Sequence, residues 1–170
     1  GERPRQLALL ARLVEVWGWT SQAEELWCTI ANGKTEQYAA LQALYRLYNT
    51  KHDTRQLMRV SSRIYQLNRA DFVAKNNLAL FSLLLHQQIY PSAHQLALET
   101  YQASSNTVAF LTTYAYSLHD QKHTADGVRL LGTLSEAQLQ DPAVSAYYGL
   151  LLADQQPDKA RPYLKRADQA

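Results

Sequence analysis

One apolar pattern recurs along this chain at a nearly constant spacing, and it constrains the fold more than any other feature. It first appears between Leu7 and Ile30, where apolar residues recur at offsets of three and four on either side of Gly18. Such offsets are typical of amphipathic helices, and a glycine between two of them is typical of a turn. The two stripes consist of Leu7, Leu10, Ala11 and Val14, followed by Ala23, Trp27 and Ile30. The stretch therefore predicts a helical hairpin.

The same template returns after about 34 residues, a period typical of helical-hairpin repeats. Its second copy consists of Leu41, Leu44, Tyr45 and Tyr48, followed by Leu57, Ser61 and Ile64. Three less regular copies follow, and the five predicted repeats lie near residues 4–34, 38–70, 72–105, 108–140 and 142–170. No stretch alternates cleanly between apolar and polar residues, so no strand is expected. The sequence predicts one all-α repeat domain over 1–170, and its start at Gly1 rather than Met indicates a piece of a longer protein.

Capping residues and prolines mark where several of the predicted helices begin. Asp71 and Asp141 are good N-caps, and a proline follows Asp141 directly. Pro91 is expected near the first position of a helix. For the last helix, a start at Asp158 keeps Pro162 within the first turn, where a missing N–H is tolerated best.

The second repeat departs from the template in its side-chain volumes. Most repeats hold a small residue in the first helix, at Ala11, Ala79, Ala115 and Gly149, and another facing it, at Ala23, Ala93, Gly127 and Ala160. In the second repeat Tyr45 and Leu57 are both large, while Ser61 stands where the first repeat has Trp27. We hypothesise that these changes compensate in volume, so that Tyr45 is a core residue and the hairpin is locally wider.

At these positions the chain resembles the tetratricopeptide repeat (TPR) family. The residues that carry the resemblance are Leu10-Ala11 and Trp27, Tyr114-Ala115, and Tyr148-Gly149. The resemblance covers nearly the whole chain as five degenerate repeats. It implies a right-handed α-solenoid of about five TPR-like hairpins, which acts as a non-catalytic scaffold for protein binding. The alternative is an ordinary antiparallel bundle of helices with similar lengths.

In the family that the chain resembles, the first helix of each hairpin lines a concave groove. The register places nine candidate peptide-binding residues there, namely Arg12, Arg46, Asn49, Asn76, Asn77, Leu80, Tyr116, Tyr147 and Leu150. The arginines and asparagines can donate to a carboxylate or a peptide backbone, and the later residues form a more apolar wall. The family's carboxylate-clamp lysines are replaced by Ala8, Ala39 and Val73, which disfavours chaperone-tail binding. The alternative is that Arg12 and Arg46 are merely solvated.

Composition excludes several classes of function. The formal charge of +2 gives no basic surplus, so nucleic-acid binding is not expected. The longest apolar run, Leu78–Leu85, is too short to span a bilayer, and the lone Cys28 forms no internal disulfide. No phosphate loop, metalloprotease motif or nucleophile elbow is present, which predicts no enzyme and no cofactor. His119 and His123 are four residues apart but straddle a predicted turn, so no metal site is expected.

The sequence thus predicts a partner that is a protein or peptide segment held in the groove. A second hypothesis is a structural or oligomerisation module that self-associates through an uncovered N-terminal edge. A third makes the repeats an adaptor attached to an enzyme domain outside this segment. A cytoplasmic and an extracytoplasmic location both remain open.

Overall fold

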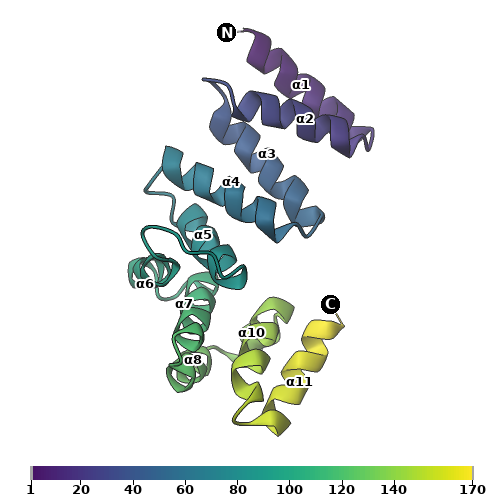
Figure 1. The fold of residues 1–170 in the computed structure, drawn as a ribbon. Coiled ribbons are helices and arrows are strands. Elements are labelled where there is room, and N and C mark those ends of the chain that lie inside the picture. The colour runs from purple at the N-terminus through teal and green to yellow at the C-terminus, as the bar shows by residue number, and fades with distance from the viewer. Residues whose placement is uncertain (1, 170) are drawn as a thin grey trace. The chain divides into compact units, whose positions relative to one another are not determined.

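Every regular element of the chain is a helix within residues 2–169, which are the residues that the computed structural model describes. Figure 1 shows the helices in chain order, coloured from the N-terminus to the C-terminus. The first six helices are α1 Glu2–Val16, α2 Thr20–Ala31, α3 Gln37–Thr50, α4 Thr54–Leu67, α5 Phe72–Leu84 and α6 Ala93–Ala103. The remaining five are α7 Val108–Asp120, α8 Thr124–Leu131, α9 Glu136–Leu139, α10 Pro142–Ala153 and α11 Pro157–Asp168.

The chain divides into two compact units, residues 1–81 and 82–170, and each is described by itself. The division falls within α5, so unit 1 contains α1 to α4 with most of α5, and unit 2 contains the helices from α6 onwards. The prediction of one continuous domain over 1–170 stays a prediction.

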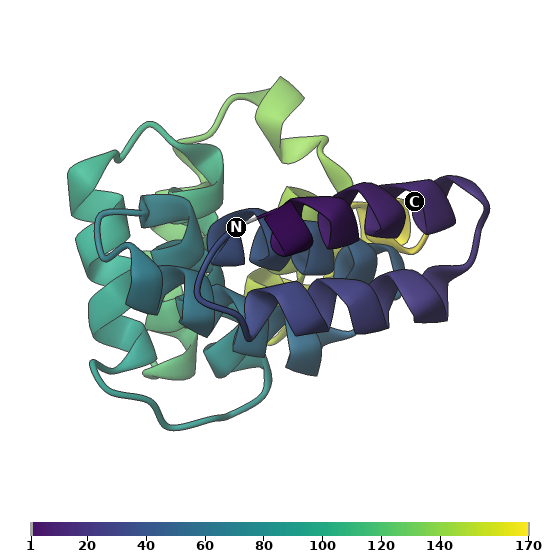
Figure 2. The same cartoon turned by 90° about the horizontal axis from the view of Figure 1, so that it is seen from above.

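The first hairpin of unit 1 forms because small residues let its helices approach closely. Ala11 of α1 and Ala23 of α2 are both fully buried. Gly18 has a φ of +76°, a left-handed conformation that glycine adopts without strain, and it reverses the chain between the two helices. The buried Trp27 donates a hydrogen bond from Nε1 to Glu15 Oε1 at 2.9 Å, which satisfies its one polar atom. Figure 2 shows α1 and α2 running side by side.

Polar contacts connect α2 to the next hairpin. Tyr48 donates to Glu24 Oε1 at 2.9 Å, and Lys51 Nζ lies 2.6 Å from Glu24 Oε2. The hydrogen bond from Lys51 lowers the pKa of the Glu24 carboxyl. Arg63 of α4 donates to the backbone oxygen of Ala31 at 2.6 Å and so satisfies a carbonyl at the end of α2. These contacts connect α2 to both α3 and α4.

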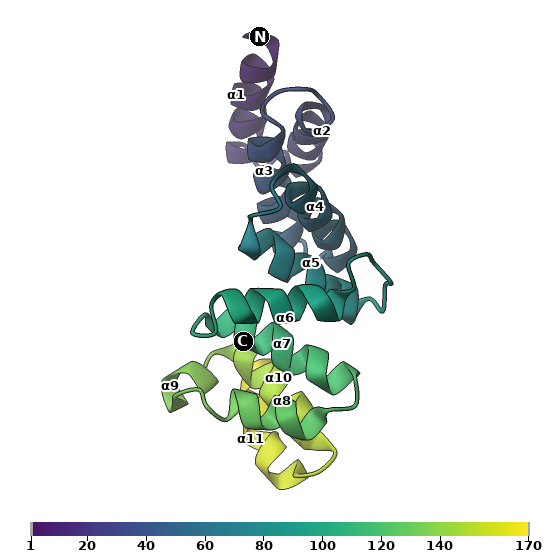
Figure 3. The same cartoon turned by 90° about the vertical axis from the view of Figure 1, so that its left-hand side faces the viewer.

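Unit 2 shows the same close approach of helices at small residues. A methyl group on Gly127 of α8 would lie 2.6 Å from the carbonyl oxygen of Ala115 in α7. A methyl group on Gly149 of α10 would lie 2.8 Å from the side chain of Leu164 in α11. The tyrosines Tyr101 and Tyr114 stack with ring centroids 5.0 Å apart. Figure 3 shows α8, α10 and α11 together with the short α9, an element that the repeat template does not predict.

The caps confirm two predicted helix starts and correct two others. The Asp71 carboxylate accepts from the backbone N–H of Ala74, and that of Asp141 accepts from two amides of the first turn of α10. The prediction for Pro91 is wrong, because α6 begins at Ala93 with Ser92 as its capping residue. The expected start of the last helix is also wrong, since α11 begins at Pro157 and holds Pro162 in its interior. Pro162 lies on the exposed face of α11, where its ring meets solvent rather than the core.

The close crossing of α7 and α8 gives a testable prediction. Gly127→Ala is expected to lower the free energy of unfolding by about 1–2 kcal/mol. The reason is that overpacking against the Ala115 carbonyl outweighs the helix propensity gained, which is about 1 kcal/mol. Urea unfolding followed by circular dichroism measures the change, and Ala125→Gln, on the exposed face of the same helix, serves as the control. An increase in stability for Gly127→Ala would contradict the close crossing.

Candidate functional site

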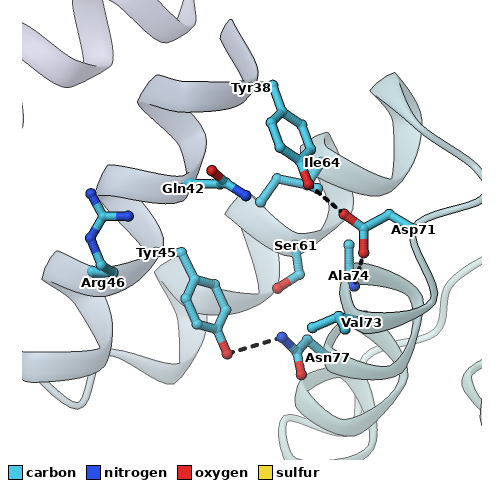
Figure 4. Close-up of a pocket in the computed structure, with 10 residues that line it drawn as sticks. All are labelled: Tyr38, Gln42, Tyr45, Arg46, Ser61, Ile64, Asp71, Val73, Ala74 and Asn77. Atoms are coloured by element: carbon cyan, nitrogen blue, oxygen red, sulfur yellow. Dashed lines mark hydrogen bonds between the residues drawn. The ribbon is translucent and has the colours of Figure 1, made fainter. Parts of the chain in front are cut away.

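Unit 1 contains a pocket of about 410 Å³ between α3, α4 and α5 (Figure 4). Its lining residues come from three consecutive helices and from the cap of α5. They are Tyr38, Gln42, Tyr45 and Arg46 of α3, Ser61 and Ile64 of α4, and Asp71, Val73, Ala74 and Asn77 at α5. On α3, Gln42 follows Tyr38 by four residues and precedes Tyr45 and Arg46 by three and four, so the four residues share one face. The volume falls within the range of ordinary ligand pockets.

Two tyrosines of α3 reach across the pocket to α5. Tyr38 donates to Asp71 Oδ2 at 2.9 Å, and this hydrogen bond raises the pKa of the Tyr38 hydroxyl. The Asn77 amide donates to the Tyr45 hydroxyl at 3.0 Å, and burial raises the pKa of Tyr45. Figure 4 shows these two bridges at either end of the pocket, with Ser61 between them. The two bridges therefore connect the α3 wall of the pocket to its α5 wall.

The pocket owes its space to the small residue at position 61. Ser61 is fully buried, and it occupies the position that the bulky Trp27 fills in the first repeat. Its hydroxyl has no hydrogen-bond partner among residues 2–169, which makes it a costly buried polar group. Tyr45 does not fill this space, because it is only half-buried and its ring packs 6.4 Å from that of Phe81. The hypothesis that Tyr45 is a core residue is therefore wrong, since its side chain forms the pocket wall.

Two pocket residues retain unused hydrogen-bonding capacity. The exposed guanidinium of Arg46 makes no ion pair or hydrogen bond to any residue in 2–169. The Asn77 side-chain amide donates one hydrogen bond to Tyr45, and its carbonyl oxygen has no partner within the same described range. The pocket therefore presents a free cation on the α3 side and a free amide acceptor on the α5 side.

Of the nine predicted groove residues, Arg46 and Asn77 are the two that line this pocket. Arg12 and Asn49 are exposed on their helices and do not line this pocket. Asn76 is buried, and its side-chain oxygen has no hydrogen-bond partner among the described residues. Leu80 is half-buried on α5 and lies outside the pocket lining.

The other three predicted residues lie in unit 2. The rings of Tyr116 and Tyr147 pack with centroids 5.4 Å apart, and Tyr116 is buried. Burial raises the pKa of Tyr147 to about 12. Leu150 is 44% exposed on α10. The two tyrosines are thus packed against each other, and Leu150 is the most open of the three.

Several pocket residues were missed by the groove register. Tyr38 precedes Arg46 by eight residues, so the helical period alone was a signal that the two share a face. Ile64 and Ser61 belong to the second helix of the hairpin, and they reach the pocket only because position 61 is small. Their place in the pocket depends on how the helices pack and is not signalled by any sequence motif.

Among residues 2–169 there is no cluster of three His, Cys, Asp or Glu side chains that could hold a metal ion. His119 Nδ1 instead lies 3.0 Å from the Thr124 hydroxyl, across the turn between α7 and α8. The half-buried Cys28 has its sulfur 3.9 Å from the Tyr48 hydroxyl. No helix in the described range is long and apolar enough to cross a membrane.

Consecutive helical hairpins with small residues at their crossings define a helical-repeat protein. Comparison with solved structures shows which helical-repeat fold this is. MamA from Desulfovibrio magneticus RS-1 matches with a TM-score of 0.70 at 10% identity, over 99% of this chain and 95% of that one. YrrB, described as a TPR protein with an unusual peptide-binding site, matches with a TM-score of 0.61 at 12% identity, over 94% of this chain and 81% of YrrB.

These likenesses confirm the predicted fold class, an all-α solenoid of TPR-like hairpins. At such low identity they establish the fold alone. No family model matches the chain, and no curated protein matches it.

The unpartnered hydroxyl of Ser61 gives a prediction for stability. Ser61→Ala is expected to raise the free energy of unfolding of unit 1 by about 1–2 kcal/mol, because it removes a buried polar group that lacks a hydrogen bond. All three tryptophans lie in unit 1, at positions 17, 19 and 27, so tryptophan fluorescence during urea unfolding reports on this unit.

Ser62→Ala on the same helix is the matched control, since Ser62 is half-buried and any gain in helix propensity is shared. Equal changes in both variants would contradict the assignment of Ser61 as an unsatisfied buried group.

Proposed function

We propose that this protein is a non-catalytic interaction scaffold, and that the pocket of unit 1 binds an extended peptide segment of a partner protein. The observation that carries the proposal is a preformed pocket with unused hydrogen-bonding groups on both walls, at Arg46 and Asn77. The description of YrrB, a solved structure with this fold, as a peptide-binding TPR protein supports the same class of ligand.

The geometry favours a peptide over a compact small molecule. The unused hydrogen-bonding groups of the pocket lie on two facing helices, Arg46 on α3 and Asn77 on α5, so a ligand that uses both must reach from one helix to the other. An extended peptide exposes a carbonyl or N–H at every residue, and the Asn77 amide offers both an acceptor and a donor to such a backbone. A short peptide that engages two or three such groups is expected to bind at roughly micromolar Kd, about −8 kcal/mol.

The prediction concerns the paired variant Arg46→Ala, Asn77→Ala. Peptides are first selected on the wild-type chain from a random library with blocked termini, and their affinities are then measured by isothermal titration calorimetry. The paired variant is expected to bind at least tenfold more weakly, because a hydrogen bond to a charged group contributes about 1.5–3 kcal/mol.

The control pair is Arg59→Ala, Gln66→Ala, which lies on exposed positions of α4 outside the pocket. Equal affinities of wild type and the Arg46, Asn77 pair would remove this pocket from the binding site. A library that yields no binder to the wild-type chain would overturn the proposed function itself.

An exposed apolar face on the first helix favours a second candidate function, self-association. It consists of large side chains on α1 and on the turn after it, namely Leu9, Leu10, Leu13, Val16, Trp17 and Trp19. Leu9 is 66% exposed and Val16 is 83% exposed. The residues that correspond to Leu9, Leu10 and Leu13 in the next repeat are Ala43, Leu44 and Leu47, which are buried in the packing of α3. The face on α1 is therefore of the kind that a neighbouring helix covers, here one from a second copy.

Sedimentation velocity tests this candidate. The wild-type chain is expected to show a concentration-dependent dimer, and Leu9→Glu, Val16→Glu is expected to remain monomeric, because charges would be buried in the contact. Leu150→Glu, at an exposed apolar position of unit 2, is the matched control and should dimerise like wild type. A wild-type chain that stays monomeric at every concentration would exclude self-association through α1.

A further inference from the structure

We infer that the unit 1 pocket selects an internal peptide sequence in which an apolar side chain enters between the Tyr38 and Tyr45 bridges while a nearby Asp or Glu pairs with Arg46. This inference rests on the proposed peptide-binding function and specifies its ligand. It concerns a side-chain carboxylate within the peptide rather than the chain terminus.

The inner part of the pocket is suited to an apolar side chain. Ile64, Ala74 and the rings of the two bridging tyrosines surround it. At the Tyr38 end of the pocket the Asp71 carboxylate is already committed, since it accepts from both Tyr38 and the Ala74 amide. A charged ligand group at this point would compete for those hydrogen bonds, so an apolar group is the better occupant.

The rim of the pocket is suited to an acidic residue. Arg46 is the lining residue with a free cationic group, as no carboxylate within residues 2–169 pairs with it. An incoming Asp or Glu can accept two parallel hydrogen bonds from a guanidinium, which adds geometric selectivity.

The charge of the whole unit points in the same direction. Residues 1–81 contain eleven Lys and Arg against seven Asp and Glu, a formal charge of +4, whereas residues 82–170 contain six against eight, a charge of −2. A net positive charge on unit 1 favours the encounter with an acidic segment over a basic one. The total formal charge of +2 is the sum of these two opposite contributions.

A charge-swap experiment tests the inference with a single selected peptide, acetylated and amidated so that no terminal carboxylate is present. Replacing its acidic residue by Lys is expected to weaken binding to wild type at least tenfold. Arg46→Glu should reverse the preference and bind the Lys peptide at least tenfold better than the acidic one. Arg59→Glu makes the same change in net charge at an exposed position of α4 outside the pocket, and it should retain the wild-type preference.

The apolar anchor is tested on the same peptide. Replacing its apolar residue by Ser should weaken binding tenfold, and Ser61→Leu, which fills the pocket, should abolish the difference between the two peptides. Should Ser61→Leu fail to fold by circular dichroism, Gln42→Trp blocks the pocket from an exposed position of α3. Peptide binding that is indifferent to the charge at position 46 would overturn this inference and leave the proposed function standing. Failure of every peptide to bind would overturn both.

Discussion

The structure depends on how closely the two helices of each hairpin approach, and side-chain volume at a few crossing positions sets that distance. A methyl group on Gly127 would lie 2.6 Å from the Ala115 carbonyl oxygen, and Ala11 and Ala23 of the first hairpin are both fully buried. Protein interiors are packed so densely that a change in side-chain volume near such a crossing alters the packing of the neighbouring residues. In the second hairpin the smaller side chain of Ser61 leaves the space that forms the pocket.

The candidate site thus arises from a local exception to a regular pattern. A serine in place of a bulky residue leaves space, and two tyrosine hydrogen bonds connect the walls on either side of it. The cost is a buried hydroxyl without a partner, at a position where an apolar residue would be more stable. Proteins commonly lose some stability at functional sites in this way. The same exception leaves Arg46 at a rim where no carboxylate of the described chain neutralises it.

Most of the fold could be predicted from the sequence, because apolar periodicity and the small crossing residues reflect packing between neighbours in the chain. The helix starts at Asp71 and Asp141 followed from capping chemistry. The interior position of Pro162 in α11 could not be predicted in this way, because it depends on which face of that helix meets solvent. For the site, helical register identified Arg46 and Asn77. It could not identify Ser61 and Ile64, whose role depends on three helices packing together, nor could it show that Tyr116 and Tyr147 pack against each other.

The central claim is that a ligand peptide lies against the two bridging tyrosines above Ser61. The most direct measurement is an isotope-filtered NOESY spectrum of the chain bound to a selected peptide. The account predicts intermolecular NOEs from the peptide's apolar side chain to the ring protons of Tyr38 and Tyr45 and to the methyl group of Ala74. Intermolecular NOEs found only to residues outside the pocket, with none to these three residues, would contradict it.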